Sequence, residues 1–198
     1  PVVISLISKG EIGPRIEALG IPVYAMGMNP RLPNPLVLWR LARLLRQLRP
    51  DVVHTWMYHA DLIGGLAARL AGCRRVIWGI HHSNLSRAEN KRSTLAVVAL
   101  CARLSRWLPA LILSCSQRAK QVHAAVGYAA AKMQVIPNGF DLARFAPNAD
   151  ARASVRAELG LPADALLVGV VARFDVQKNH LGFVQAAAQV LVQLPQVH

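Results

Sequence analysis

The chain is poor in acidic residues and in aromatic residues. Only 10 of its 198 residues are Asp or Glu against 23 Lys and Arg, which gives a formal net charge of +13. A basic excess of this size favours anionic partners such as nucleotide sugars, acidic lipids or nucleic acid. Aromatic residues make up 6% of the sequence, and this scarcity argues against nucleic acid, because proteins that bind it stack bases on aromatic rings placed among basic side chains.

Cysteine is scarce as well, and long apolar runs are absent. Cys73, Cys101 and Cys115 have no spacing typical of a metal site, and we expect buried thiols in a reducing compartment. The most apolar stretch, residues 95–113, is interrupted by Arg103 and Arg106, so the sequence contains no segment suited to spanning a bilayer. These absences favour a cytoplasmic protein, free or peripheral on the inner face of the membrane.

Strand-like and helix-like segments alternate along the chain, a pattern typical of an α/β fold with a mainly parallel sheet. The strand-like segments are residues 2–7, 21–25, 51–55, 75–80, 110–115, 133–136 and 165–171. The helix-like segments are residues 14–19, 36–48, 61–71, 93–107, 117–126 and 180–192.

Two cations lie on the loop between the last strand-like segment and the last helix-like segment. Residues 165–171 form a continuous apolar run, which predicts a parallel strand covered on both faces. Arg173 and Lys178 follow it, and in open α/β sheets ligands bind at this end of the strand, where the next helix offers free N–H groups to an anion. Arg173 could grip a diphosphate bidentately with Lys178 as a point charge. The alternative is a pair of solvated loop cations.

A second signal lies upstream, in residues 133–147. Pro137 cannot continue a central strand, and Asn138 followed by Gly139 favours a turn, so the strand-like segment ends here and the chain changes direction. The segment is interpreted either as an ordinary loop or as a crossover between two domains.

Taken together, IPNGFDLARFAP (residues 136–147) and ARFDVQKNH (residues 172–180) resemble the interdomain segment and donor-phosphate loop of family 4 glycosyltransferases. The likeness continues upstream through residues 49–72, 76–83 and 111–120. Members of this family are retaining enzymes with the two-domain GT-B fold. The resemblance therefore implies a Rossmann-like acceptor-side domain over residues 1–137, followed over residues 138–198 by the interdomain linker and the start of a donor-binding domain.

The resemblance also implies a donor site. Arg173 and Lys178 match the family's Arg and Lys, which hold the diphosphate of the nucleotide sugar and stabilise its charge as the glycosidic bond breaks. Asn179, Asn138 and Gly139 belong to the same predicted donor-binding set. Because the two cations neutralise the diphosphate, no metal and no other cofactor is expected.

One histidine is implied on the acceptor side. His81 follows the strand-like segment 75–80, where the family has a His that faces the transferred sugar, and it is favoured over its neighbour His82. Both lie in a polar loop, so solvated side chains are the alternative. His54 and His59 fit packing or capping roles.

The implied reaction is retaining transfer of a sugar from a nucleoside-diphosphate sugar to an acceptor hydroxyl on a glycan or lipid-linked precursor. Family members carry, beyond the Lys-Asn pair, two glutamates seven residues apart, and this sequence has no counterpart. We therefore expect a fragment cut at both ends, with little activity alone. The alternatives are another GT-B sugar-nucleotide enzyme such as an epimerase, or a non-catalytic basic membrane-binding module.

The predicted helix 36–48 carries a basic stripe. Arg40, Arg43 and Arg46 recur among leucines and beside Trp39, a composition that fits an anionic membrane surface. Residues 91–107 repeat this mixture of basic and apolar residues. An ordinary sheet-covering helix with solvated arginines is the alternative.

Overall fold

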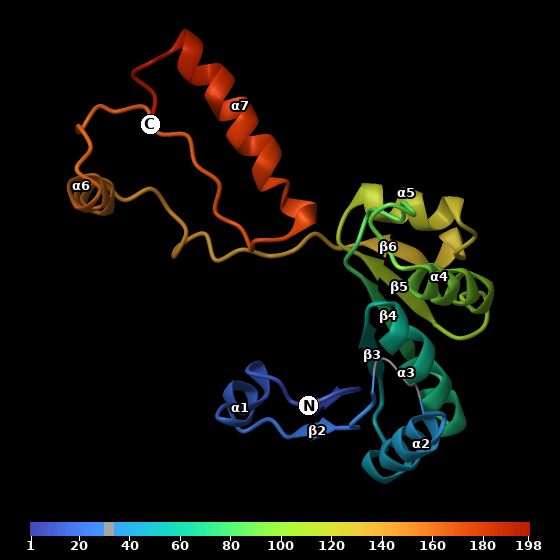
Figure 1. Ribbon diagram of the computed structural model, residues 1–198. Helices are drawn as coiled ribbons and strands as arrows, with labels where there is room; N and C mark the ends of the chain where they lie inside the picture. The colour runs from blue at the N-terminus through green and yellow to red at the C-terminus, as the bar shows by residue number, and fades with distance from the viewer. Residues whose placement is uncertain (30–33) are drawn as a thin grey trace. The chain divides into compact units, whose positions relative to one another are not determined.

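The computed structural model describes residues 1–29 and 34–198 and divides into two compact units, Pro1–Asn138 (unit 1) and Gly139–His198 (unit 2). Figure 1 shows the order of the elements along the chain. The division falls one residue beyond the end of the first predicted domain at residue 137.

Unit 1 contains two parallel sheets. The smaller sheet pairs β1 (Val3–Ser5) with β2 (Val23–Ala25), and α1 (Ile12–Glu17) connects the two strands. The larger sheet has the order β3-β4-β5-β6, with the strands β3 (Val53–Trp56), β4 (Val76–Ile80), β5 (Leu111–Ser114) and β6 (Met133–Val135). Because neighbouring strands follow each other in sequence and run parallel, all four carboxyl ends meet at one edge of the sheet.

Helices connect the strands of the larger sheet. They are α3 (Tyr58–Leu70), α4 (Arg92–Leu104) and α5 (Gln117–Ala125), with the short η1 (Ala130–Lys132) before β6, and α2 (Leu36–Leu48) precedes β3 and packs on α3. The apolar strand β4 lies between two neighbours, and Val76, Trp78 and Ile80 are fully buried in the core of unit 1. The alternating α/β pattern expected from the sequence is confirmed in this unit.

The junction between β3 and α3 is much tighter than the sequence predicts. The helix begins at Tyr58 rather than at residue 61, and Met57 alone separates it from the strand. Met57 has φ 71° and ψ 159°, a conformation that side-chain-bearing residues avoid at a cost of about 1–3 kcal/mol. Its N–H donates to the carbonyl of Gly79 on the neighbouring strand at 2.9 Å. Hydrogen bonding to the neighbouring strand therefore fixes this turn, although the local sequence has no glycine that would predict it.

Unit 2 contains α6 (Ala149–Glu158), η2 (Val176–Lys178) and α7 (His180–Gln193). Side-chain caps define where both helices begin. Asn148 accepts a hydrogen bond from the Ala151 N–H at 2.9 Å, and Asn179 accepts one from the Gly182 N–H at 3.2 Å. Such caps satisfy N–H groups that have no partner within the helix.

The predicted strand over residues 165–171 is wrong for this structure. The segment is extended, but Leu166 makes only an isolated bridge to Val197, closed by hydrogen bonds with His198. Val168 and Val171 are exposed, so the segment is not covered on both faces. An apolar run becomes a buried strand only where neighbouring strands accept its hydrogen bonds, and no such ladder forms around it within the described residues.

The predicted turn at Asn138 and Gly139 is also displaced. Neither residue lies in a turn, and the chain turns instead at Asp141, whose carboxylate accepts hydrogen bonds from the N–H groups of Ala143 and Arg144 at 3.1 Å. An Asp that bonds its own backbone two residues on is a common turn-former.

Of the three cysteines, only Cys101 is buried as predicted, whereas Cys73 and Cys115 are half-buried. Within residues 1–29 and 34–198, no helix combines the length and apolar character needed to cross a bilayer.

Candidate functional site

The loop that carries Arg173 and Lys178 is held by contacts of its first residues with His180. The ring Nε2 of His180, the first residue of α7, lies 2.8 Å from the Arg173 carbonyl oxygen and donates to it, since a carbonyl can only accept. The Phe174 ring stacks on the same imidazole with centroids 5.4 Å apart. Asp175 accepts a hydrogen bond from the Gln177 N–H at 2.9 Å. The loop thus has a defined backbone conformation without using either cationic side chain.

Both cationic side chains of this loop are free. Arg173 and Lys178 are exposed, and neither side chain makes a hydrogen bond or ion pair with any residue that the structure describes. Lys178 ends η2, and Asn179, at φ 49°, caps the 14-residue helix α7. The site therefore combines two unpaired cations with the positive end of a helix, an arrangement suited to an anion.

The remaining residues predicted to bind the donor are Asn138 and Gly139. Both are exposed, and nothing lies within 4 Å of the position that a Cβ would occupy at Gly139. They stand at the division between the units, whereas Arg173, Lys178 and Asn179 share one loop of unit 2.

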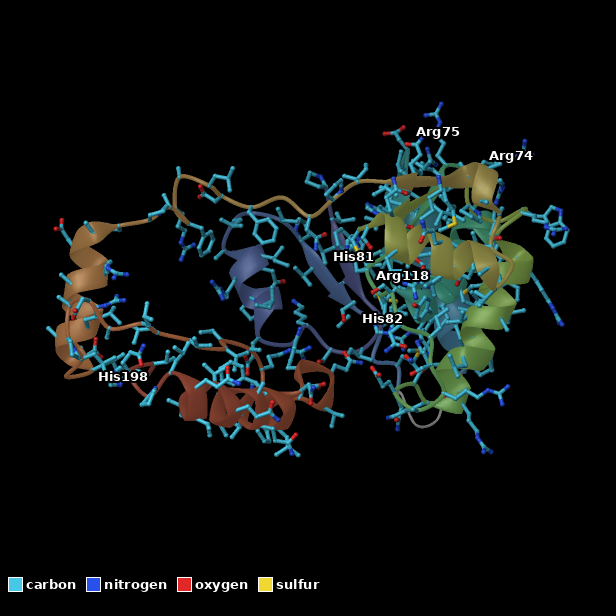
Figure 2. The ribbon with its side chains drawn as sticks, turned by 90° about the horizontal axis from the view of Figure 1, so that it is seen from above. Arg74, Arg75, His81, His82, Arg118 and His198 are labelled. Atoms are coloured by element: carbon cyan, nitrogen blue, oxygen red, sulfur yellow. The ribbon has the colours of Figure 1, made fainter. Side chains whose placement is uncertain are left out.

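His81 lies in unit 1, immediately after β4. Its imidazole stacks face to face on the Trp56 indole, with centroids 4.4 Å apart and an interplanar angle of 5°. A stacked pair of aromatic rings contributes about 0.5–1.5 kcal/mol beyond the area that it buries. His81 and His82 directly follow β4, and Arg118 lies in the first turn of α5, shortly after β5, which pairs with β4; Figure 2 labels all three residues.

His54 and Gly79 complete the surroundings of this stack. The His54 ring lies 5.2 Å from that of Trp56, centroid to centroid. Burial, together with the charge of His81, lowers the pKa of His54. Trp56 pairs with Gly79 across the two strands, and a Cβ at Gly79 would lie 2.9 Å from the Thr55 carbonyl and 3.2 Å from the His54 ring. The glycine is therefore needed for this close approach of backbone and rings.

A buried carboxyl lies beneath the same edge. Asp61, in the first turn of α3, has no exposed surface, and its Oδ1 accepts a hydrogen bond from the Thr55 hydroxyl at 2.6 Å, while its Oδ2 has no partner. Burial raises the pKa of Asp61 to about 8, although the Thr55 hydrogen bond opposes the shift. At neutral pH the carboxyl is therefore mainly protonated, because the ionised form would be desolvated without a compensating charge.

His123, for which the sequence suggests no partner, belongs to a buried polar cluster. Its Nδ1 donates to the Ala119 carbonyl at 2.8 Å, which leaves Nε2 to accept from the Tyr58 hydroxyl at 2.9 Å. The Tyr128 ring packs edge-on against the imidazole. Burial is the main cause that lowers the pKa of His123 and raises that of Tyr58. We interpret the cluster as a structural contact that holds α3 and α5 together.

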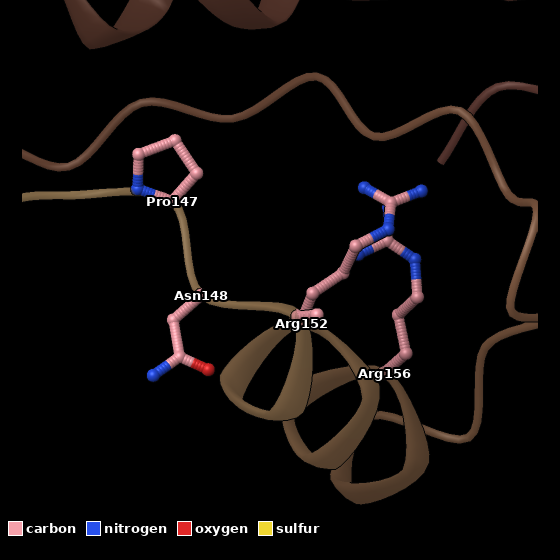
Figure 3. Close-up of a pocket in the computed structure, with 5 residues that line it drawn as sticks. Pro147, Asn148, Arg152 and Arg156 are labelled. Carbon is pink, nitrogen blue, oxygen red and sulfur yellow. The ribbon is translucent and has the colours of Figure 1, made fainter.

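The hollow drawn in Figure 3 lies beside the start of α6 and contains none of the predicted site residues. It is lined by Pro147, Asn148, Ala149, Arg152 and Arg156. Arg156 donates from Nη2 to the Ala165 carbonyl at 3.3 Å, so it fastens the chain after α6 to the helix. No group of His, Cys, Asp and Glu within the described residues forms a metal site.

The sequence analysis missed Trp56. The signal available was the alternation along the strand, since His54 and Trp56 are two residues apart and share one face of the sheet. Its proximity to His81 follows only from the pairing of β3 with β4.

Comparison with known proteins gives matches along most of the chain. Residues 2–144 match Glycosyltransferase Family 4. The UDP-Gal:alpha-D-GlcNAc-diphosphoundecaprenol alpha-1,3-galactosyltransferase of Escherichia coli is 30% identical over 159 residues, which make up 76% of this chain and 39% of that enzyme. The D-inositol 3-phosphate glycosyltransferase of Kineococcus radiotolerans is 46% identical over 65 residues, 33% of this chain and 15% of that protein.

Among solved structures, the chain is similar to Anabaena HepE, crystallised in complex with UDP. The TM-score is 0.76 with 23% sequence identity, over 95% of this chain and 50% of HepE. At this identity the likeness concerns the fold alone. The chain thus spans about half of HepE and about two fifths of the E. coli enzyme.

Proposed function

The chain belongs to glycosyltransferase family 4 and has the α/β architecture of the GT-B type, and from this premise we propose that the protein is a retaining glycosyltransferase. It moves a sugar from a nucleoside-diphosphate sugar to an acceptor hydroxyl. The observation that carries this proposal is the loop of unit 2, where the side chains of Arg173 and Lys178 bond to no residue that the structure describes and stand next to the capped start of α7.

On the donor side, this loop holds the diphosphate. Arg173 binds phosphate oxygens through its planar guanidinium, Lys178 adds a point charge, and the first N–H groups of α7 complete the anion site. When the bond from the anomeric carbon to the diphosphate breaks, the diphosphate leaves with the electron pair and gains negative charge. Preorganised cations stabilise such charge at little reorganisation cost, and in this proposal they make a metal unnecessary.

On the acceptor side, His81 contacts the transferred sugar. Its place after β4 puts the imidazole at the carboxyl edge of a parallel sheet, which is where ligands bind in folds of this class. Asn138 and Gly139 belong to the same proposed donor-binding set. The acceptor hydroxyl gives its proton to the departing diphosphate oxygen as its own oxygen bonds to the anomeric carbon on the face from which the diphosphate leaves.

The proposed substrates follow from the relatives' names. The E. coli enzyme is named for UDP-Gal and a diphosphoundecaprenol-linked acceptor, and HepE was crystallised with UDP. We infer a uridine-diphosphate sugar as donor, a lipid-linked or other glycan precursor as acceptor, and a location in the cytoplasm at the inner face of the membrane.

The test is product analysis with the full-length protein. It is incubated with isotopically labelled UDP-sugars and lipid-linked acceptors, and the anomeric coupling constant of the new linkage is measured by NMR. An α-linked product from an α-linked donor is expected. Release of an epimerised sugar without transfer to any acceptor would instead identify the other GT-B chemistry, and inversion at the anomeric carbon would refute the retaining mechanism.

We propose that α2 makes the contact with the membrane. One face of this helix, with Val37, Leu41 and Leu45, is buried against the core, while Trp39, Arg40 and Arg43 are exposed beyond it. Arg46 differs from the other two arginines, because it donates to the Leu70 carbonyl at the end of α3 at 2.6 Å. The surface proposed for anionic lipid is therefore Trp39 with Arg40 and Arg43.

Reversing both charges, Arg40→Glu with Arg43→Glu, is expected to weaken binding to vesicles that contain anionic lipid by at least tenfold at low salt, since each basic residue near such a surface contributes about 1 kcal/mol. Vesicle sedimentation measures the effect. The matched control is Arg74→Glu with Arg75→Glu, an exposed pair outside α2 (Figure 2) that changes the net charge equally. Equal losses in both variants would show a general charge effect and refute a surface on α2.

A further inference from the structure

The carboxyl end of β3 presents a tryptophan to the predicted sugar-facing histidine. Trp56 is the last residue of the strand, and its side chain is 58% exposed although it ends a strand that borders the core. Met57 follows in a strained conformation and is tied to β4 through the Gly79 carbonyl. A backbone that holds strain at one position needs the surrounding structure to fix it, and such positions concentrate at functional sites.

The strained turn directly follows the residue that contacts His81. β3 ends at Trp56, and its indole lies flat on the imidazole with 4.4 Å between centroids and 5° between planes. Within the described part of the chain, the His81 ring makes no hydrogen bond. The contact that can fix the plane of the ring is therefore the Trp56 indole, since even a Cβ at Gly79 would lie in ordinary contact with it, 3.6 Å from the His81 Nε2.

We propose that Trp56 is a positioning residue for His81: the indole fixes the plane of the imidazole at the sheet edge, so that the ring meets the transferred sugar in one orientation. This inference rests on the proposed function. A histidine on a loop with several rotamers would reach the reactive orientation only part of the time, and losses of order 10²-fold accompany misplacements of about 1 Å in enzymes. Trp56 itself makes no bond to the substrate in this proposal.

The first experiment asks whether the stack exists in solution. In the full-length protein, the imidazole protons of His81 are assigned by NMR with His81→Ala. We expect an upfield ring-current shift that disappears in Trp56→Leu and persists in part in Trp56→Phe. The matched control is Trp107→Leu, which removes another exposed tryptophan whose ring stacks on no other ring among the described residues. An unshifted His81 signal in the unmodified protein would overturn the proposal.

The second experiment measures kcat and KM for sugar transfer. Trp56→Leu is expected to lower kcat about 10- to 100-fold with little change in the donor KM, and Trp56→Phe is expected to restore most of the rate. In the His81→Ala background the same change should have no further effect, because the indole acts through the imidazole. A kcat that is equal in Trp56→Leu and the unmodified protein, or an equal further loss without His81, would refute the positioning role.

These outcomes separate this inference from the proposed function. If the protein transfers no sugar but His81 shows the ring-current shift, the proposed function fails, and so does the role assigned to the stack in catalysis. If transfer proceeds with retention and Trp56→Leu leaves kcat unchanged, the proposed function stands and only the positioning role fails. Melting temperatures of all variants identify any that do not fold, and the His81 ring-current shift in the unmodified protein supplies the test should Trp56→Leu be among them.

Discussion

Arg173→Ala is expected to lower kcat for sugar transfer by about 10²–10³-fold while leaving the melting temperature unchanged. Removing one preorganised donor from a site that stabilises developing negative charge typically has an effect of this size. The guanidinium has no partner in the described structure, so its loss breaks no internal contact. The backbone of the loop is held by the hydrogen bond from His180 to the Arg173 carbonyl, which the substitution retains. Steady-state kinetics on the full-length protein measure the effect.

Two further variants sharpen this experiment. Arg173→Lys keeps the charge but loses the planar fork, and we expect an intermediate rate because a lysine cannot grip two phosphate oxygens at once. Arg152→Ala removes an exposed arginine from α6 in the same unit and should leave kcat within a factor of two. A rate in Arg173→Ala close to that of Arg152→Ala would show that the loop cations are merely solvated, as the sequence alone allows.

The second large effect concerns stability and its dependence on pH. Asp61→Asn is expected to stabilise the protein at pH 8 by up to about 5 kcal/mol, which raises the melting temperature by about 10 °C or more, and to have a much smaller effect near pH 4. Asn has nearly the same shape as Asp and cannot ionise. It therefore removes the cost of keeping a carboxyl neutral in a site where it has no exposed surface.

The direction follows from the raised pKa of Asp61. The folded state keeps the carboxyl proton up to about pH 8, whereas the unfolded chain releases it near the ordinary pKa of 3.8. Its contribution to stability is complete below that lower value and is lost as the pH rises through the folded pKa, because only the unfolded state gains from ionisation in between. Melting curves of both proteins from pH 4 to pH 9 test this, with exposed Asp51→Asn as control. A constant difference at all pH values would mean that Asp61 is ionised in the folded protein.

Much of the fold of unit 1 is predictable because its signals are local. The run around Trp78 is apolar throughout and becomes the buried strand β4, and the periodic leucines of residues 36–48 become α2 with the predicted ends. The run 165–171 has the same apolar character but remains exposed, since the hydrogen bonds of a strand come from neighbours that the local sequence does not encode.

The residues of the candidate site also differ in how far the local sequence predicts their arrangement. Arg173, Lys178 and Asn179 are neighbours in sequence, so a motif could place them on one loop. The contact between Trp56 and His81 depends on the pairing of β3 with β4 and on an unusual backbone conformation at Met57. Neither condition leaves a pattern in composition or periodicity, so the stack had to be found in the structure.

The hydrogen bond from Arg46 to the Leu70 carbonyl lets α3 fix the distance between two parts of unit 1. One end of this 13-residue helix starts at the turn that follows Trp56, and the other end is bonded to α2. At 1.5 Å per residue the helix is about 20 Å long. Because both ends of α3 are anchored by the fold, the distance between His81 at the carboxyl edge of the larger sheet and any surface that α2 contacts is fixed within unit 1. If α2 rests on a membrane as proposed, an acceptor tethered in that membrane must carry its reactive hydroxyl at a matching distance from its anchor.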